Sequence, residues 1–226
     1  VEAAMRAGAR EVGLIDEPIA AALGAGLPVT EATGNMIIDI GGGTTEVAVL
    51  SLQGTVLSES VRVAGDELTD SIVQYMKKVH NLIIGERTAE EIKIRLGSAY
   101  PLPGEDEPMM EVRGLHLMSG LPRTVTIKGE EIRESMSEPL SVIVDAVKRT
   151  LERTLPELAA DIIDRGIMLA GGGALLRGLD TLISHETGIV THVAEDPLRC
   201  VVKGTGEVLK NQKLLERILS ETSRTA

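Results

Sequence analysis

Apolar and polar residues along this 226-residue chain follow two different periods. Short runs of aliphatic and β-branched residues, bounded by glycine, proline or asparagine, predict strands, whereas apolar residues that recur every three or four positions predict helices. Strands are predicted at 11–15, 36–40, 45–50, 56–63, 111–117, 123–128, 167–170 and 189–193. Helices are predicted at 2–10, 18–25, 67–81, 88–98, 130–136, 139–155, 156–164, directly after 173, from 197 and at 208–222, with an acidic, proline-bearing loop at 101–108. Strands that alternate with helices indicate an α/β fold.

The first glycine-rich segment lies between two apolar runs and predicts strand, tight turn, strand. It consists of Gly41, Gly42, Gly43, Thr44 and Thr45. Glycine tolerates positive φ and lets a phosphate approach the backbone N–H groups closely. A hairpin of this kind is therefore either a nucleotide-phosphate loop or a glycine-rich turn without a ligand.

The sequence around this turn excludes two common phosphate motifs. No Lys-Ser/Thr pair follows the glycines, so the segment is not a P-loop, and residues 45–50 predict a strand where a dinucleotide fingerprint requires a helix. Asp39, at the end of the first strand, is placed to hold a hydrated divalent cation against bound phosphates. Hairpin phosphate loops are typical of the superfamily of actin, heat-shock chaperones and sugar kinases.

A second glycine turn, Gly171-Gly172-Gly173, follows the predicted strand 167–170 and leads directly into a predicted helix. The free N–H groups at a helix N-terminus favour anionic ligands, although close packing of a helix on a strand also selects glycine. Two glycine turns so far apart in the chain suit a nucleotide that lies between two lobes.

Three charged residues each allow a structural and a functional interpretation. Glu90 and Lys93 lie on one face of a predicted helix, either as a surface ion pair or as contacts to ribose hydroxyls. Glu17 is either an acid that stabilises a helix N-terminus or a carboxylate that positions water for attack on a γ-phosphate, with Thr44 in reach.

The composition of the chain argues against nucleic acid as a partner, an intrachain disulfide and a membrane-spanning segment. The net charge is −11, and the chain has two tyrosines but no phenylalanine or tryptophan, which disfavours nucleic-acid binding by charge attraction or base stacking. The single cysteine, Cys200, permits no intrachain disulfide and fits a reducing compartment. No apolar stretch approaches the roughly 20 residues that span a bilayer.

Several segments taken together resemble the MreB family of bacterial actin-like rod-shape proteins, and the resemblance covers essentially the whole chain. They are Val12–Ala22, Asp39–Val49, Gly65-Asp66, Ala89–Lys93, Gly97–Pro101, Leu169–Arg177 and Ala194–Leu198. The resemblance implies an actin-like ATPase fold with a ribonuclease H-like core. It also implies an ATP- and Mg²⁺-dependent protein of the bacterial cytoplasm, which forms filaments at the inner face of the membrane. Such filaments would guide the cell-wall elongation proteins and set rod shape.

The resemblance also assigns roles by position. Gly41 to Thr45 resemble the second phosphate loop of the family, and Asp39 resembles the acid that holds Mg²⁺ through water. Glu17 and Thr44 resemble the water-positioning pair, Glu90 and Lys93 the ribose contacts, and Gly171, Gly172, Gly173 and Ala174 the adenosine loop.

The same comparison predicts the domain organisation. Residues 1–32 and 196–226 would belong to an incomplete first lobe, 33–65 and 138–195 to the core of the second lobe, and 66–137 to its inserted small subdomain. The family's other phosphate hairpin and its membrane-touching segment would lie upstream of Val1. We therefore expect the chain by itself to bind nucleotide weakly and to hydrolyse ATP poorly.

Two other functions remain open on this fold. A small-molecule kinase or polyphosphatase is the first, but a kinase needs a general-base aspartate, and none other than Asp39 stands near the first glycine turn. A chaperone-type ATPase is the second, and it requires a peptide-binding domain after the ATPase domain.

Overall fold

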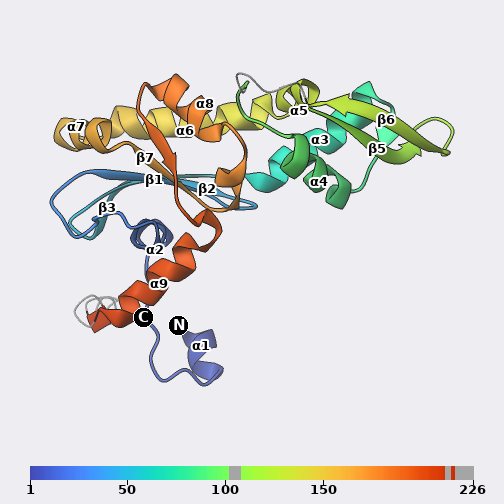
Figure 1. Cartoon of the computed structure of the whole chain (residues 1–226). Helices are drawn as coiled ribbons and strands as arrows, with labels where there is room; N and C mark the ends of the chain where they lie inside the picture. The colour runs from blue at the N-terminus through green and yellow to red at the C-terminus, as the bar shows by residue number, and fades with distance from the viewer. Residues whose placement is uncertain (102–107, 212–214, 217–226) are drawn as a thin grey trace.

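The computed structural model describes residues 1–101, 108–211, 215 and 216. It is an α/β structure with a five-stranded and a three-stranded sheet (Figure 1). Most of the predicted loop at 101–108 and most of the predicted helix at 208–222 lie outside the described residues. Within the described part of the chain, no helix is both long enough and apolar enough to cross a membrane.

The larger sheet has the strand order β3-β2-β1-β7-β8. Its strands are β1 (Asn35–Ile40), β2 (Thr45–Ser51), β3 (Gly54–Val61), β7 (Ile167–Ala170) and β8 (Thr191–Val193). Strands β1 and β2 form the predicted antiparallel hairpin, and β7 and β8 extend the sheet in parallel. Every residue of β1 is buried, because helices cover both faces of the sheet at its centre.

The helices that cover the two faces of the larger sheet come from different parts of the chain (Figure 1). One face packs against α6 (Ser137–Arg153), α7 (Pro156–Arg165) and α8 (Leu179–Thr187), and the other against α2 (Glu17–Gly24) and α9 (Cys200–Lys210). Ile38 and Ile40 belong to the first core, while Ile37 belongs to the second. This division follows from the alternation of side chains along a strand.

Helices α2 and α9 contact each other through their backbones. A Cβ atom at Gly24 would lie 1.8 Å from the Cys200 carbonyl oxygen, and one at Gly204 would lie 1.8 Å from the Ala20 carbonyl oxygen. Any larger side chain at either glycine would push the helices apart.

The smaller sheet has the order β4-β5-β6 and is accompanied by three helices. Its elements are β4 (Leu82–Ile83), β5 (Met109–His116), β6 (Pro122–Lys128), α3 (Gly65–Val79), α4 (Glu86–Leu96) and α5 (Gly129–Ser135). Val112 and Ile127 are buried in the same apolar core as the face of the larger sheet that α6, α7 and α8 cover. Helix α3 follows β3 in the chain and connects the larger sheet to the smaller one.

The structure corrects three local predictions. Residues 11–15 form no strand, because they lie largely exposed between α1 (Glu2–Arg6) and α2 and pair with no described strand. Helix α4 begins at Glu86, before the predicted start at residue 88. The glycines after β7 lead into a short 3₁₀ turn, η1 (Gly172–Leu175), and α8 starts only after Gly178, whose φ of +72° breaks the helical path.

Candidate functional site

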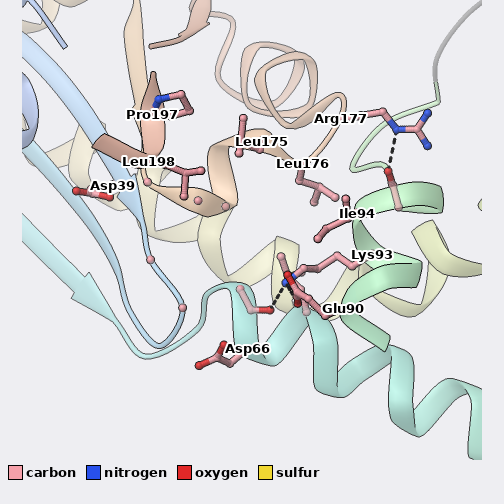
Figure 2. Close-up of a pocket in the computed structure, with 18 of the residues that line it drawn as sticks. Asp39, Asp66, Glu90, Lys93, Ile94, Leu175, Leu176, Arg177, Pro197 and Leu198 are labelled. Atoms are coloured by element: carbon pink, nitrogen blue, oxygen red, sulfur yellow. Dashed lines mark hydrogen bonds and ion pairs between the residues drawn. The ribbon is translucent and has the colours of Figure 1, made fainter. Parts of the chain in front are cut away.

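A pocket of about 660 Å³ lies where the two sheets meet, and both glycine turns line it. Its walls come from the β1–β2 hairpin, α3, α4, η1 and the short 3₁₀ turn η2 (Pro197–Arg199) that precedes α9 (Figure 2). Helix α2 contributes Glu17. The lining residues are Glu17, Asp39, Gly41, Gly42, Gly65, Asp66, Leu68, Glu90, Lys93, Ile94, Gly97, Gly171, Gly172, Gly173, Leu175, Leu176, Arg177, Pro197, Leu198 and Val201. The sequence-predicted residues Gly43, Thr44, Thr45 and Ala174 lie outside this lining.

The β1–β2 hairpin is fixed to the start of α3 by its carbonyl groups. The Gly41 carbonyl accepts a hydrogen bond from Gly65 N–H at 3.1 Å, and the Gly42 carbonyl accepts one from Asp66 N–H at 2.8 Å. In a trans peptide the next N–H points the opposite way. The N–H groups of Gly42 and Gly43 therefore point away from α3.

These hairpin amides have no internal partner. Within the described residues, the N–H groups of Gly42, Gly43 and Thr44 donate no hydrogen bond, although Gly41 N–H donates to the Thr44 carbonyl at 2.9 Å. None of the three glycines has a positive φ, so backbone conformation is not what requires glycine here. The remaining reason for glycine is open approach, because a Cβ at Gly43 would meet no atom within 4 Å. Exposed, unsatisfied N–H groups on such a turn favour an anion.

The two hairpin threonines occupy different environments. Thr44 is exposed, whereas Thr45 is fully buried and its hydroxyl donates to the Val63 carbonyl at 2.7 Å. The Thr45 side chain thus links β2 to the segment that leads into α3.

We expect Thr45→Val to lower the free energy of unfolding by about 1–3 kcal/mol, because it leaves the Val63 carbonyl without its donor. Thr44→Val, the matched variant one residue away, should change stability by less than about 0.5 kcal/mol, since surface substitutions usually do. Urea unfolding of both variants checks the prediction. Equal losses would contradict it.

Asp39 is a buried carboxylate with an unsatisfied oxygen. Its side chain lies at the end of β1 with a residue exposure of 7%, and its Oδ2 atom has no hydrogen-bond partner among the residues that the structure describes. Burial, followed by the nearby charges of Glu17 and Glu46, raises the pKa of Asp39 to about 6. A buried, unpartnered carboxylate oxygen beside two further acids fits a nearby cation.

The side chains around Asp39 suit a Mg²⁺ ion whose ligands are mainly water and phosphate oxygens. Among the described residues, no cluster of three or more His, Cys, Asp or Glu side chains could hold a metal ion. Mg²⁺ is commonly bound by one or two carboxylates, with water and phosphate oxygens completing its octahedron. Asp39 is thus suited to a hydrated Mg²⁺ that also contacts phosphates.

Glu17 is the first residue of α2, and its exposed side chain lines the pocket near Asp39. Its position at a helix N-terminus is favourable for an acid. The effect of its charge on the pKa of Asp39 also places it at the acidic end of the pocket.

Glu90 and Lys93 form an ion pair of 2.7 Å on α4, but Lys93 is not a surface residue. The Lys93 side chain is only 13% exposed, and its ammonium also donates to the Gly65 carbonyl at 2.8 Å. Burial disfavours the charged form of Glu90, but hydrogen bonds from Lys93 and Thr69 outweigh it and lower the pKa of Glu90.

The second glycine turn packs tightly on β1. Gly171 has a φ of +79°, and a Cβ there would lie 2.3 Å from the Ile40 carbonyl oxygen. A Cβ at Gly173 would lie 2.2 Å from the Ile40 side chain. Close packing is therefore sufficient reason for glycine at both positions.

The sequence reasoning missed an apolar wall of the pocket. Ile94, Leu175 and Leu198 line it with exposures of 68%, 55% and 67%, and they lie on α4, η1 and η2 (Figure 2). Leu175 lies in the segment directly after Gly173 that is predicted as a helix, but α8 begins only at Leu179. Exposed aliphatic side chains around one cavity suit a flat, apolar ligand group.

The sequence matches the profile of the family described as MreB/Mbl protein over residues 1–217. The chain belongs to the MreB/Mbl family. It is 56% identical over 209 residues to the cell shape-determining protein MreB of Escherichia coli K12, which covers 92% of this chain and 60% of that protein. The cell shape-determining protein Mbl of Bacillus subtilis 168 is 48% identical over 220 residues, covering 97% of this chain and 66% of the relative. The chain thus spans about three fifths of the length of the E. coli MreB.

Solved structures place this MreB/Mbl chain among actin-like proteins. MreB5 of Spiroplasma citri bound to ADP matches with a TM-score of 0.89 and 40% identity, over 92% of this chain and 63% of that one. The same protein bound to AMPPNP matches with a TM-score of 0.90 and 38% identity, over 98% and 65%. The MamK double helical filament, at 20% identity and a TM-score of 0.70 over 87% and 59%, shares the fold. The predicted family and the predicted actin-like α/β fold are both confirmed.

Proposed function

We propose that this chain is part of an ATP-binding, actin-like cytoskeletal protein. Its filaments would lie at the inner face of the bacterial membrane and direct cell-wall elongation and rod shape, with ATP hydrolysis regulating filament dynamics. One observation carries the nucleotide part of the proposal. A single pocket is lined by Gly41 and Gly42 of the hairpin, the unsatisfied Asp39 carboxylate and an apolar wall, and the free hairpin amides begin at Gly42. The solved structures of MreB5 of Spiroplasma citri bound to ADP and to AMPPNP support the proposed nucleotide binding.

The polar end of the pocket would bind the phosphates. The hairpin from Gly41 to Thr45 offers backbone N–H groups at Gly42, Gly43 and Thr44, and Asp39 would hold Mg²⁺ through water. The metal ion would neutralise the charge of the phosphates. Glu17 and Thr44 would orient the attacking water, since phosphoryl transfer needs mainly positioning and charge neutralisation.

The opposite end would bind the nucleoside. Gly171, Gly172, Gly173 and Ala174 would form the adenosine loop, with the exposed side chains of Ile94, Leu175 and Leu198 against the base. The pair of Glu90 and Lys93 would lie at the ribose edge.

The division into lobes and the partners are proposed because the chain belongs to the MreB/Mbl family. Residues 33–65 and 138–195 would form the second-lobe core, 66–137 its small subdomain, and 1–32 with 196–226 parts of the first lobe. The chain would assemble with further copies of itself and act with cell-wall elongation proteins at the inner membrane. The net charge of −11 argues against nucleic acid as a partner.

The test uses this chain joined to the upstream region of the E. coli relative. We expect negative-stain microscopy to show filaments that require MgATP, and Glu17→Ala should make them persist several times longer by slowing hydrolysis. Glu157→Ala, which removes an exposed acid from the first turn of α7, is the matched control and should behave as wild type. A soluble monomer that transfers phosphate to a small acceptor would overturn the proposal in favour of a kinase.

A further inference from the structure

The C-terminal end of α4 is held by an arginine from another part of the chain. Arg177 lies just after η1, and its Nε atom donates to the Gly97 carbonyl at 3.2 Å, while its Nη2 atom donates to the Leu96 carbonyl at 3.1 Å. Helix α4 ends at Leu96, and the last carbonyls of a helix have no donor inside the helix. A guanidinium is favourable at this end, because it is always charged and the helix dipole is negative there. Arg177 therefore supplies both donors and a favourable charge.

The backbone joins the same two elements. Ala99 N–H donates to the Arg177 carbonyl at 2.7 Å, beside a parallel bridge between Ser98 and Arg177. Gly97 allows Leu176 to come close, since a Cβ at Gly97 would lie 3.3 Å from Leu176 Cδ1. The end of α4 and the residues after η1 are thus packed tightly against each other.

This contact lies beside the apolar end of the pocket. Ile94 is three residues before Gly97 on α4, and Leu175 is two residues before Arg177 at the end of η1. Both apolar side chains are exposed in the pocket wall. Figure 2 shows the Arg177 side chain extending towards the end of α4 and away from Leu175. The guanidinium therefore joins the two walls without standing between them.

The α4 side of the contact is also fixed to the part of the chain that bears the smaller sheet. Arg133 of α5 donates from Nη1 to Ser98 Oγ at 3.0 Å, and Ser98 is buried. Leu96 is buried in the core that Val112 of β5 shares. Arg177 consequently ties η1 to a segment that cannot move independently of α4 and α5.

We propose that Arg177 is a positioning residue that sets the separation of α4 and η1, and hence the width of the apolar end of the pocket. It acts through the carbonyls of Leu96 and Gly97 and not through contact with the ligand. This inference rests on the proposed nucleotide function. It predicts that loss of the guanidinium weakens binding of the nucleoside and leaves binding of the phosphates unchanged.

The ligand test compares MgATP with magnesium tripolyphosphate, which lacks the nucleoside, by NMR titration of the full ¹⁵N-labelled chain. We expect Arg177→Met to weaken ATP by roughly three- to ten-fold, about the value of one hydrogen bond, and to leave tripolyphosphate unchanged. Arg177→Lys keeps the charge but not the forked donors, so it should lose less. It also carries the same comparison if Arg177→Met does not fold.

The matched control is Arg95→Met, which removes an exposed arginine of α4 that pairs with Glu91. It makes the same change of charge and should bind both ligands as wild type does. An equal loss of ATP and tripolyphosphate in Arg177→Met, or unchanged ATP binding, would overturn the proposal.

A second measurement needs no ligand. Gly97 N–H lies at the end of α4 and donates to the Lys93 carbonyl at 3.0 Å. We expect its hydrogen exchange to accelerate about ten-fold in Arg177→Met, because the helix end opens more readily without the two guanidinium donors. The Ala89 amide, at the start of the same helix, should keep its wild-type rate. Weaker ATP binding with unchanged exchange at Gly97 would overturn the positioning role in favour of a direct contact between Arg177 and the ligand.

The two measurements also separate this inference from the proposed function. A wild-type chain that binds neither MgATP nor tripolyphosphate would count against the nucleotide function. The exchange rate at Gly97 would then still decide whether Arg177 fixes α4 to η1.

Discussion

Gly171→Ala is expected to lower the free energy of unfolding by about 2–5 kcal/mol, which combines a left-handed backbone cost with overpacking. The glycine has a φ of +79°, and a Cβ there would lie 2.3 Å from the Ile40 carbonyl oxygen and 2.4 Å from Asp39 Oδ1. Neither neighbour can move easily, because Ile40 and Asp39 belong to the central strand. Urea unfolding followed by circular dichroism measures the loss.

Gly188→Ala separates the two contributions to that loss. Gly188 has a similar φ of +73°, but a Cβ there would meet no atom within 4 Å. Its substitution should therefore cost only the backbone term, about 1–2 kcal/mol. If both variants lose the same stability, the close approach of the second glycine turn to β1 is not what requires glycine.

Asp39→Asn is expected to stabilise the ligand-free chain at pH 7.5 by as much as about 3 kcal/mol, the value of a two-unit pKa difference. The folded chain raises the pKa of Asp39 from 3.8 to about 6, first by burial and then by the charges of Glu17 and Glu46. The folded state thus holds the proton more tightly than the unfolded state. The resulting stability is fully present below about pH 4 and is lost as the pH rises through 6.

The measurement is urea unfolding of wild type and Asp39→Asn between pH 4.5 and 7.5. The two chains should differ least at the acidic end, where Asp39 is largely protonated in the folded chain, and should diverge towards pH 7.5. Asp164→Asn, an exposed aspartate on α7, should show a constant difference from wild type. A difference for Asp39→Asn that does not change with pH would refute the assignment of the pH dependence to this carboxylate.

The sequence predicted the central parts of the fold because their signals are local. Residues 36–50 carry two apolar runs around a glycine turn, and the structure forms this hairpin with the pairing Ile40↔Thr45 at its end. The long amphipathic pattern of α6 likewise needs only its own spacing. The structure brings residues of both glycine turns and Asp39 together at one pocket.

The errors concern features that tertiary contacts decide. An apolar run at 11–15 becomes a strand only if another strand pairs with it, and no described strand does. Helix α8 begins at Leu179 and not directly after Gly173, because the glycine turn and η1 pack closely on Ile40. The letters Gly-Gly-Gly do not specify this packing. The burial of Lys93 depends on Gly65 and Thr69, which are far from it in sequence. Spacing alone therefore could not distinguish a surface ion pair from an internal one.

The backbone contact between α2 and α9 has a consequence for synthesis of the chain. The sheet face that bears Ile37, Ala48 and Leu50 is made early, but it packs in the same core as Cys200 at the start of α9. Helix α2 reaches its final packing only against Gly204. A nascent chain must therefore carry this apolar face without its full cover until α9 has left the ribosome, and nascent chains of this kind are prone to aggregate. Folding of this layer is consequently completed after translation of α9.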